Sequence, residues 1–358
     1  RASGDLRRGG MVLVRDEEGG AALVLSPEYV NAASLDRLRA ETGSHPRLVL
    51  SRHRAAALDL KPGEGPVIAL SIRDGADPAL LRDLADPTAR AVGRAVSTEA
   101  LEPAMAHRRD AAAVTLAKIA NLLPAAITGP LTIPDADIAA WAVAQNLLVV
   151  SVADIDAHLH AAAASLQQVS SAQVPLDHAE NARIVAFRPA DGGVEHIAVI
   201  VGAPRADQPV LTRIHSQCFT GDLLGSLRCD CGDQLRGAVR MLGENGGGIL
   251  LYLAQEGRGI GLVNKLRAYD LQDQGYDTID ANRQLGFDAD ERHYRVAAEM
   301  LRSLGFESVR LLTNNPEKIA ALARFGIAVV ERVAHAFPAN GHNQAYLATK
   351  ARRAGHLL

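Results

Sequence analysis

The alternation of apolar and polar positions divides the first half of the chain into short strands and helices. Two β-branched runs within 11–25, separated by a charged turn that contains glycine, predict a hairpin. A helix is expected to begin near Ser26, where a serine precedes a proline and a glutamate. The other predicted elements are strands over 47–51 and 65–72, a helix over 108–124, and a helix, a strand and a helix over 135–168.

The second half shows a longer alternation of the same kind. The polar segment 167–182 is expected to be irregular, so we place a domain boundary near residue 170. Asp191-Gly192-Gly193 then predicts a hairpin turn between two strands. The elements expected after it are a strand over 209–216, a helix over 233–246, a strand over 247–255, a glycine-rich turn, a helix over 263–275, a loop, a helix over 295–305, a strand over 308–315 and a helix over 316–326.

This rhythm predicts an α/β (mixed α+β) fold with two domains, 1–170 and 171–358, each a mixed sheet covered by helices. The length of 358 residues allows each domain its own core. A net charge of −3 provides no global basic field, which argues against a nucleic acid or an anionic membrane as partner. Apolar runs of about 18 residues and an N-terminal apolar leader are both lacking, so we expect a cytoplasmic location.

The cysteines are the first sign of chemistry. All three, Cys218, Cys229 and Cys231, lie in one short window, and an odd, clustered set is unlike a disulfide framework. Zinc prefers thiolate ligands, and catalytic zinc keeps three protein ligands and one open position. The spacing therefore predicts a catalytic zinc site. His215 could supply a fourth ligand, and three ordinary buried thiols are the simpler alternative.

A glycine-rich turn follows a predicted buried strand. Gly257, Gly259 and Gly261 precede a helix, so their backbone amides could hold an anion, and Arg258 and Lys265 add positive charge. Turns of this composition are also common for packing reasons alone. The turn is a candidate phosphate site.

Two further polar segments could take part. Asp290 and Arg292 would place a carboxylate base beside a cation, whereas a solvated charged turn is the usual meaning of such a run. Thr313 ends a strand at the point where a helix begins with Pro316. Lys318 in the first turn opposes the helix dipole, and a bound phosphate would account for it.

Read together, four segments resemble GTP cyclohydrolase II in order and spacing over roughly 180–358. They are HSQCFTGDLLGSLRCDCGDQL, QEGRGIGLVNKLRAYDLQDQGYDT, ANRQLGFDADER and RLLTNNPEK, followed by the tail YLATKARRAGHLL. The family converts GTP to 2,5-diamino-6-(5-phosphoribosylamino)pyrimidin-4-one, formate and pyrophosphate, the entry step of riboflavin biosynthesis. The resemblance implies GTP as substrate, one zinc ion per subunit on the three cysteines, magnesium with the triphosphate, and a homodimer.

The resemblance also implies roles for single residues. Asp290 matches the proton acceptor and Tyr269 a tyrosine near the reacting base, although a packed helix tyrosine is the simpler interpretation. Arg292 matches the nucleophile toward the α-phosphorus, but a guanidinium is almost never deprotonated, so charge stabilisation stays an alternative. The matched nucleotide contacts are Arg213, Ile214, His215, Ser216, Gln217, Gln234, Glu256, Gly257, Arg258, Thr278, Thr313 and Lys318.

Two positions depart from the family pattern. Gln217 stands where the family has Glu, and Ala254 stands where it has Arg. The losses could compensate each other or could change substrate or rate. We therefore keep two alternatives to an active cyclohydrolase: a nucleotide-binding regulator without turnover, and a diverged enzyme with another product.

The N-terminal half resembles 3,4-dihydroxy-2-butanone 4-phosphate synthase in the segments around 6–31 and 111–155. The acidic run of that enzyme is missing, because Asp16-Glu17-Glu18 leads directly into Gly19-Gly20. Its Gly-His-Thr element is replaced near His107, and its later Glu by ITGP. Those groups would hold magnesium and move protons. We expect a degenerate, non-catalytic domain that supports folding or dimerisation, with His107 a surface residue.

Overall fold

The computed structural model describes residues 1–17, 20–61, 63, 65–89, 99–338, 341–353 and 355, apart from the side chains of 345–348 and 350. The described chain forms two compact units that do not follow chain order. The first unit contains 1–158 and 263–291, and the second contains 159–262 and 292–358. The predicted domains 1–170 and 171–358 divide the chain differently, because 263–291 packs with the N-terminal half.

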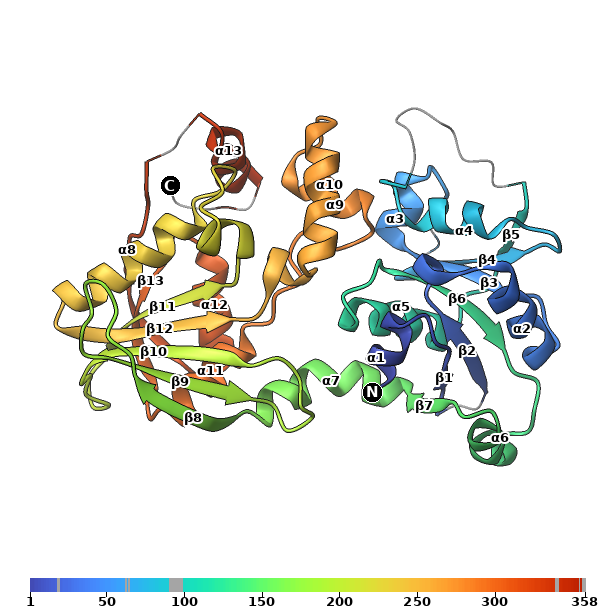
Figure 1. Ribbon diagram of the computed structural model, residues 1–358, viewed down its shortest axis with the longest axis horizontal. Coiled ribbons are helices and arrows are strands. Elements are labelled where there is room, and N and C mark those ends of the chain that lie inside the picture. The colour runs from blue at the N-terminus through green and yellow to red at the C-terminus, as the bar shows by residue number, and fades with distance from the viewer. Residues whose placement is uncertain are drawn as a thin grey trace. The chain divides into compact units, whose positions relative to one another are not determined.

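The first unit is built on a seven-stranded mixed sheet (Figure 1). Its strand order is β5-β4-β3-β6-β2-β1-β7, and every neighbouring pair is antiparallel except β1 with β7. The pairing of β1 with β2 confirms the predicted first hairpin. The strands are β1 (Val12–Arg15), β2 (Ala21–Leu25), β3 (Arg47–Ser51), β4 (Val67–Ile72), β5 (Leu101–Ala104), β6 (Ala125–Pro130) and β7 (Leu148–Ser151).

Helices cover this sheet. Valines 12, 14 and 24 face helix α5 through its buried alanines, whereas Leu13 and Leu23 between them are buried on the opposite face, as strand alternation requires. The helical elements are α1 (Ala2–Arg7), η1 (Pro27–Tyr29), α2 (Ala32–Thr42), α3 (Arg52–Ala57), α4 (Pro78–Ala85), α5 (Arg108–Ile119), η2 (Asp135–Asp137), α6 (Ile138–Ala144) and α7 (Val152–Ala164), of which the part from Leu159 onward belongs to the second unit. The first unit also holds α9 (Leu262–Asp273), apart from its first residue, and α10 (Thr278–Gln284).

The prediction that a helix begins near Ser26 is wrong. Ser26 caps only the short 3₁₀ turn η1, and Val30 is extended, so the α-helix α2 begins at Ala32 after its own cap, Asn31. The Asn31 side chain accepts a hydrogen bond from the Ser34 amide, and the Ser34 hydroxyl lies 3.0 Å from the Asn31 amide. This reciprocal capping is a stronger helix start than the Ser-Pro-Glu signal.

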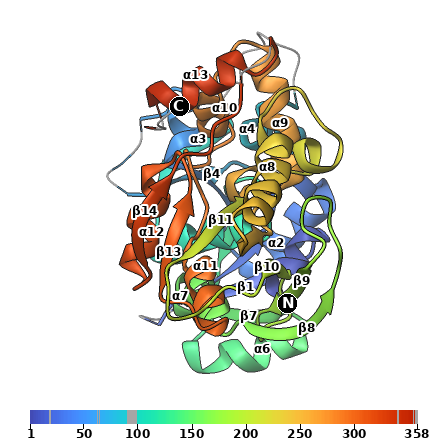
Figure 2. The ribbon, with the colours of Figure 1, turned by 90° about the vertical axis from the view of Figure 1, so that its left-hand side faces the viewer.

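A second seven-stranded mixed sheet forms the second unit (Figure 2). Its order is β14-β13-β11-β12-β10-β9-β8, parallel from β14 to β12 and antiparallel from β12 to β8. The antiparallel pair β9 and β10 confirms the hairpin predicted at Asp191-Gly192-Gly193. The strands are β8 (Gln167–Gln173), β9 (Ala182–Arg188), β10 (His196–Gly202), β11 (Val210–Ser216), β12 (Gly247–Leu253), β13 (Ser308–Leu312) and β14 (Ala328–Val333).

Two segments predicted to lack regular structure are ordered. Residues 167–173 form β8, an entirely exposed strand that pairs antiparallel with β9 and closes one edge of the sheet. Polar side chains are typical of an edge strand, so composition alone resembled a loop. The loop predicted after residue 275 contains the short polar helix α10, which begins after the cap Asp277.

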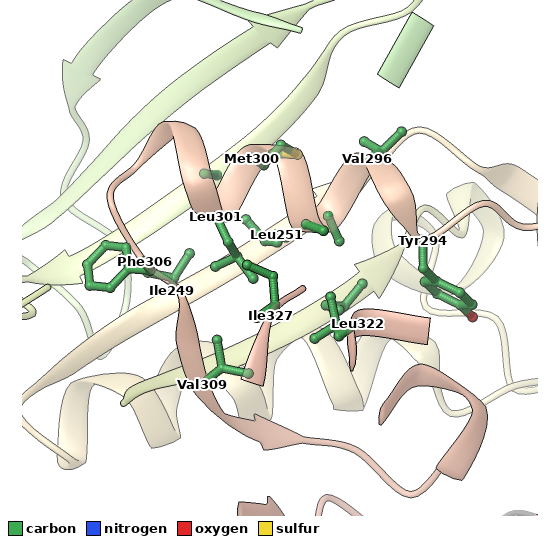
Figure 3. Packing of buried hydrophobic residues seen from close by; sticks show 14 of the residues in the cluster. Ile249, Leu251, Tyr294, Val296, Met300, Leu301, Phe306, Val309, Leu322 and Ile327 are labelled. Atoms are coloured by element: carbon green, nitrogen blue, oxygen red, sulfur yellow. The ribbon is translucent and has the colours of Figure 1, made fainter. Parts of the chain in front are cut away.

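The core of the second unit lies on both faces of its sheet. Along β12, Ile249 and Leu251 pack against α11 and α12, with Met300 and Leu322 (Figure 3), whereas Leu250 packs on the side of α8. Both faces are buried, as is typical of a parallel sheet between helices. The remaining helical elements are η3 (Phe219–Leu223), α8 (Cys231–Glu244), η4 (Glu256–Gly259), α11 (Arg295–Ser303), α12 (Pro316–Arg324) and α13 (Gln344–Arg353).

The carboxyl ends of β11, β12 and β13 meet at one edge of this sheet because these strands are parallel. Ser216, Leu253 and Leu312 are their last residues, so the segments that follow them lie at that edge. Ligands of open α/β sheets bind there. In the described part of the chain, none of the helices is long and apolar enough to cross a bilayer.

Candidate metal centre and nucleotide site

The three cysteines meet at the edge of the second sheet. Cys218 follows β11, and Cys229 and Cys231 lie at the start of α8; their sulfurs all lie within 4.8 Å of one another. The sulfurs of Cys218 and Cys229 are 3.7 Å apart. A tetrahedral zinc ion with Zn–S bonds of about 2.3 Å holds its sulfurs about 3.8 Å apart. Among the described residues, this is the one cluster of three or more ligand side chains that could hold a metal.

The cysteine loop leaves no space for a side chain at Gly221. A Cβ added there would lie 2.7 Å from the sulfur of Cys229 and 3.0 Å from that of Cys218. The π-helical turn η3, which contains Gly221, thus brings its backbone against the sulfurs. Gly221 has no positive φ, so glycine is not needed for its backbone conformation. It is needed because the backbone lies so close to the sulfurs.

The chemistry of the thiols also fits a cation. The hydrogen bond with the Cys218 side chain raises the pKa of Cys229 to about 11. Hydrogen bonds with Cys218 and Cys229 raise the pKa of Cys231. Three thiolates so close together repel one another, so a bound cation would be needed to deprotonate them all at neutral pH.

His215 does not belong to the sulfur cluster, which favours three cysteine ligands over a fourth ligand from His215. Its Nε2 lies 3.0 Å from a carboxylate oxygen of Asp222, and both side chains are buried. Burial lowers the pKa of His215, so the ring is neutral at neutral pH and donates from Nε2. The buried Nδ1 is then an acceptor, and it lacks a hydrogen-bond partner among the described residues.

Asp222 is a residue that sequence reasoning missed. Besides His215, it accepts hydrogen bonds from the Cys218 amide at 2.9 Å and from the Tyr252 hydroxyl at 3.0 Å. It therefore fixes the backbone that carries the first cysteine. The available signal was an acidic residue inside the cysteine loop, four positions after Cys218.

Two buried cations lie beside the cluster. Arg213 donates to the Leu312 carbonyl at 3.0 Å and to the Gln234 side chain, and Lys318 donates to the Ile214 carbonyl at 2.8 Å. Burial lowers the pKa of Arg213 to about 10, yet the guanidinium is still charged at neutral pH. Burying cations is costly, and a bound phosphate would offset part of that cost.

Tyr294, also unnoticed in the sequence, links two predicted site residues. The Arg292 guanidinium lies 5.6 Å from the centre of its ring, and the Lys318 ammonium 5.9 Å. Such cation–π contacts hold positive groups in place. Arg213, Arg292 and Lys318 thus lie near one another as a group of cations.

The glycine-rich turn is held to the cysteine loop by a carboxylate. One oxygen of Glu256 accepts the Phe219 amide at 2.6 Å, and the other accepts the Gly257 amide at 3.0 Å. Gly257 and Arg258 both have positive φ, at 63° and 62°. Positive φ is unfavourable for arginine. Because the Gly257 amide already bonds to Glu256, it is not available to a phosphate in this arrangement.

The two departures from the family pattern lie next to each other. The backbone amide of Gln217 donates to the Leu253 carbonyl at 2.8 Å. Ser216 pairs with Leu253 at the end of the parallel strands β11 and β12. Gln217 and Ala254 directly follow these neighbouring strands. Two side chains there would be adjacent, so an acid and a base lost together can compensate for each other.

The other predicted site residues are divided between the two units. The Thr313 hydroxyl is buried and accepts the Asn315 amide at 3.0 Å, which caps the approach to α12. The Ser216 hydroxyl is buried and lacks a hydrogen-bond partner among the described residues. Tyr269, Thr278 and Asp290 belong to the first unit, where the Lys265 ammonium lies 5.7 Å above the Tyr269 ring. Their place relative to the second unit's residues stays a prediction.

The N-terminal half contains no second ligand cluster within the residues that the structure describes. His107 is half-buried and precedes α5; its amide donates to Asp110 at 2.9 Å. The buried Asp110 also accepts the Thr128 hydroxyl at 2.9 Å, which gives this acid a structural role. Glu18 and Gly19, where the acidic run of the synthase was sought, lie outside the described residues.

The chain is similar in sequence to known proteins. Residues 167–334 match the family model of GTP cyclohydrolase II. A GTP cyclohydrolase-2 from Azospirillum brasilense is 53% identical over 100% of this chain and 93% of its own length. A riboflavin biosynthesis protein RibBA from Chlorobium phaeovibrioides is 33% identical over 99% and 94%.

Among solved structures, RibBX from A. baumannii, a two-domain 3,4-dihydroxy-2-butanone 4-phosphate synthase, covers 94% of this chain and 98% of its own, with 16% identity and a TM-score of 0.35. A GTP cyclohydrolase-2 from Xylella fastidiosa is 39% identical over 100% of this chain and 86% of its own. The identities of 53% and 39% to the two GTP cyclohydrolase-2 sequences, over the whole of this chain, show that it belongs to the GTP cyclohydrolase II family.

Proposed function

We propose that the chain is a zinc-dependent GTP cyclohydrolase II in riboflavin biosynthesis. It would hydrolyse GTP to 2,5-diamino-6-(5-phosphoribosylamino)pyrimidin-4-one, formate and pyrophosphate. The observation that carries the proposal is the group of three cysteine sulfurs, all within 4.8 Å of one another, beside buried cations. Relatives named GTP cyclohydrolase-2 match it over its whole length.

Cys218, Cys229 and Cys231 would hold one zinc ion per subunit. Zinc with three protein ligands supplies Lewis-acid activation of water at its open position. The chain's own contribution is to set the sulfurs at the right spacing, which the close backbone of Gly221 and the hydrogen bond from Cys218 to Asp222 support.

The nucleotide would lie along the carboxyl ends of β11 and β13. Arg213 and Lys318 would bind phosphate oxygens, and magnesium would neutralise the leaving pyrophosphate. His215 Nδ1 and the Ser216 hydroxyl, both buried and unpartnered among the described residues, are polar groups that could hydrogen-bond the base or the ribose. The other proposed contacts are Ile214, Gln217, Gln234, Glu256, Arg258, Thr278 and Thr313. Gly257 would join them only if its amide left the Glu256 carboxylate.

Asp290 would accept the proton during ring opening, and Tyr269 would orient the reacting base. Arg292 would stabilise charge at the α-phosphate, because a guanidinium keeps its proton and this one is held over Tyr294. The resemblance alone favours a nucleophile at Arg292. The chain would act as a homodimer, and its N-terminal half would lack synthase activity, since the magnesium-binding motifs of that enzyme are missing from the sequence.

The direct experiment is to incubate zinc-loaded protein with magnesium and GTP and to follow formate, pyrophosphate and the pyrimidine together. Asp290→Ala is the control. Equal release of all three products, lost in the control, is the expected result. Pyrophosphate without formate would favour an enzyme with another product. Tight GTP binding without any product would favour the regulator.

A further inference from the structure

We propose that the N-terminal half is a scaffold for residues 263–291 of the cyclohydrolase sequence, and that Lys118 is a positioning residue for Asp290. The inference rests on the proposed function, in which Asp290 accepts a proton. It assigns a structural role to the N-terminal half, for which the sequence predicts no catalytic activity. Its basis is the compact first unit, which joins 263–291 to 1–158.

Helix α9 is tied to the N-terminal half by a buried arginine. The Arg267 guanidinium lies 2.7 Å from a carboxylate oxygen of Glu28 and 2.9 Å from one of Asp86. All three side chains are at least 80% buried. Next to them, the buried Asn264 donates to the Asn121 carbonyl at 3.0 Å. Buried, hydrogen-bonded ion pairs of this kind specify one docking position.

Helix α10 ends against α3, in Figure 1 orange against blue. Arg54 donates to the Gln284 carbonyl at 3.0 Å, and the Ser51 hydroxyl to the Gly286 carbonyl at 2.6 Å. Gly286 has a φ of 95°, and a Cβ there would lie 2.7 Å from the Ser51 hydroxyl. The backbone that leaves α10 is therefore closely packed on the N-terminal half.

Lys118 of α5 holds the loop that follows. Its ammonium lies 3.0 Å from Asp288 and 2.7 Å from Glu291, the acids on either side of Asp290. Glu291 also accepts the Asp288 amide at 2.9 Å, and His53 lies 3.0 Å from the Asp288 carboxylate. One cation thus closes the turn 288–291 and attaches it to the N-terminal half.

This contact matters because proton transfer depends on geometry. A general base must reach its proton within hydrogen-bond distance. Asp290 lies inside the turn that Lys118 closes, so release of Asp288 and Glu291 would let its backbone move. A displacement of about 1 Å can cost about 100-fold in rate.

The test compares Lys118→Met, Lys118→Arg and the control Arg73→Met in the full-length, zinc-loaded protein. Arg73 directly follows β4 and pairs with Glu102 of β5 at 2.7 Å, so its loss removes an exposed ion pair of the same unit away from 263–291. We expect kcat for formate release to fall about 10- to 100-fold in Lys118→Met with little change in KM. Lys118→Arg should restore most of it, and amide exchange over 285–291 should rise only in Lys118→Met.

A second variant separates positioning from folding. Glu291→Gln removes one partner of Lys118 while keeping its shape, and the two losses should be less than additive in the double variant. A kcat in Lys118→Met equal to that of Arg73→Met would overturn the inference, as would strict additivity. Wild-type protein that releases no formate would instead overturn the proposed function, and amide exchange over 285–291 would then decide whether Lys118 fixes the turn.

Discussion

His215 and Asp222 form a buried pair at the cysteine loop, with Nε2 3.0 Å from the carboxylate. The histidine is neutral because burial lowers its pKa, so the pair is a hydrogen bond from a neutral ring to a carboxylate. The same carboxylate accepts the Cys218 amide. A group that touches no sulfur thus sets the position of the first cysteine, as residues around metal ligands commonly do.

Asp222→Asn should weaken zinc binding. Three donors face the carboxylate, and an amide offers only one acceptor oxygen, so at least one donor loses its partner. We expect a zinc affinity about 10- to 100-fold lower, measured by competition with a chelator. Asp207→Asn, at an exposed ion pair with Arg205, is the matched control. Equal zinc affinity in both variants would refute a role for Asp222 in placing Cys218.

Gly221→Ala should empty the metal site without unfolding the protein. The new methyl would lie 2.7 Å from the Cys229 sulfur, so the thiols must separate. The expected result is loss of bound zinc, measured by metal analysis, with an unchanged circular dichroism spectrum. Gly341→Ala, where an added Cβ meets nothing within 4 Å, should retain its zinc. Full occupancy in Gly221→Ala would contradict the packing described here.

The sequence predicted the strongly patterned elements and the cysteine cluster. Strand β12 is a run of apolar residues between glycines and a polar turn, and both of its faces are buried. The metal site could be predicted because its three cysteines lie close together in the sequence. Asp222 was missed because a single acid in a loop has no periodic signal.

The division into units could not be predicted. It depends on contacts such as Arg267 with Glu28, which are 239 positions apart. Strand β8 was missed for a similar reason, because its pairing with β9 outweighs its polar composition. Tertiary contacts, which no local pattern records, decide both features.

Gln217→Glu and Ala254→Arg should affect each other's outcome. Either change alone places one charge just after β11 or β12 without its counterpart on the neighbouring segment, whereas together they can form an ion pair. We expect each single variant to lower kcat/KM and the double variant to recover most of it. The measurement is a double-mutant cycle on formate release. Additive losses would show that the two positions act independently.

The ion pair of Lys118 gives a pH dependence. Burial acts to raise the pKa of Asp288, but the ammonium of Lys118 outweighs it, and the pKa is lowered. Burial likewise opposes the higher pKa of Lys118, which Glu291 and Asp288 produce. A lowered acid pKa stabilises above its unfolded value of about 3.9 and loses that stability as pH falls through the folded value, whereas a raised lysine pKa stabilises below about 10.4 and loses it at higher pH.

Lys118→Met should therefore lower the free energy of unfolding, because Lys118 pairs both with the half-exposed Asp288 and with the buried Glu291, whose charge would be left without this partner. The difference from wild type should be constant near neutral pH and should shrink below about pH 4. Urea unfolding across this range is the measurement, and Asp288→Asn is the background in which the low-pH decline should weaken. A difference that grows on acidification would contradict the assigned signs.

The most direct test of the central claim is a zinc titration of activity. Metal is removed with a chelator, the protein is reloaded stepwise with zinc in the presence of magnesium and GTP, and formate release is measured at each step. The account predicts no release without zinc and a rise that ends at one zinc ion per chain, with Cys231→Ser inactive throughout. Full formate release by the metal-free protein would contradict it.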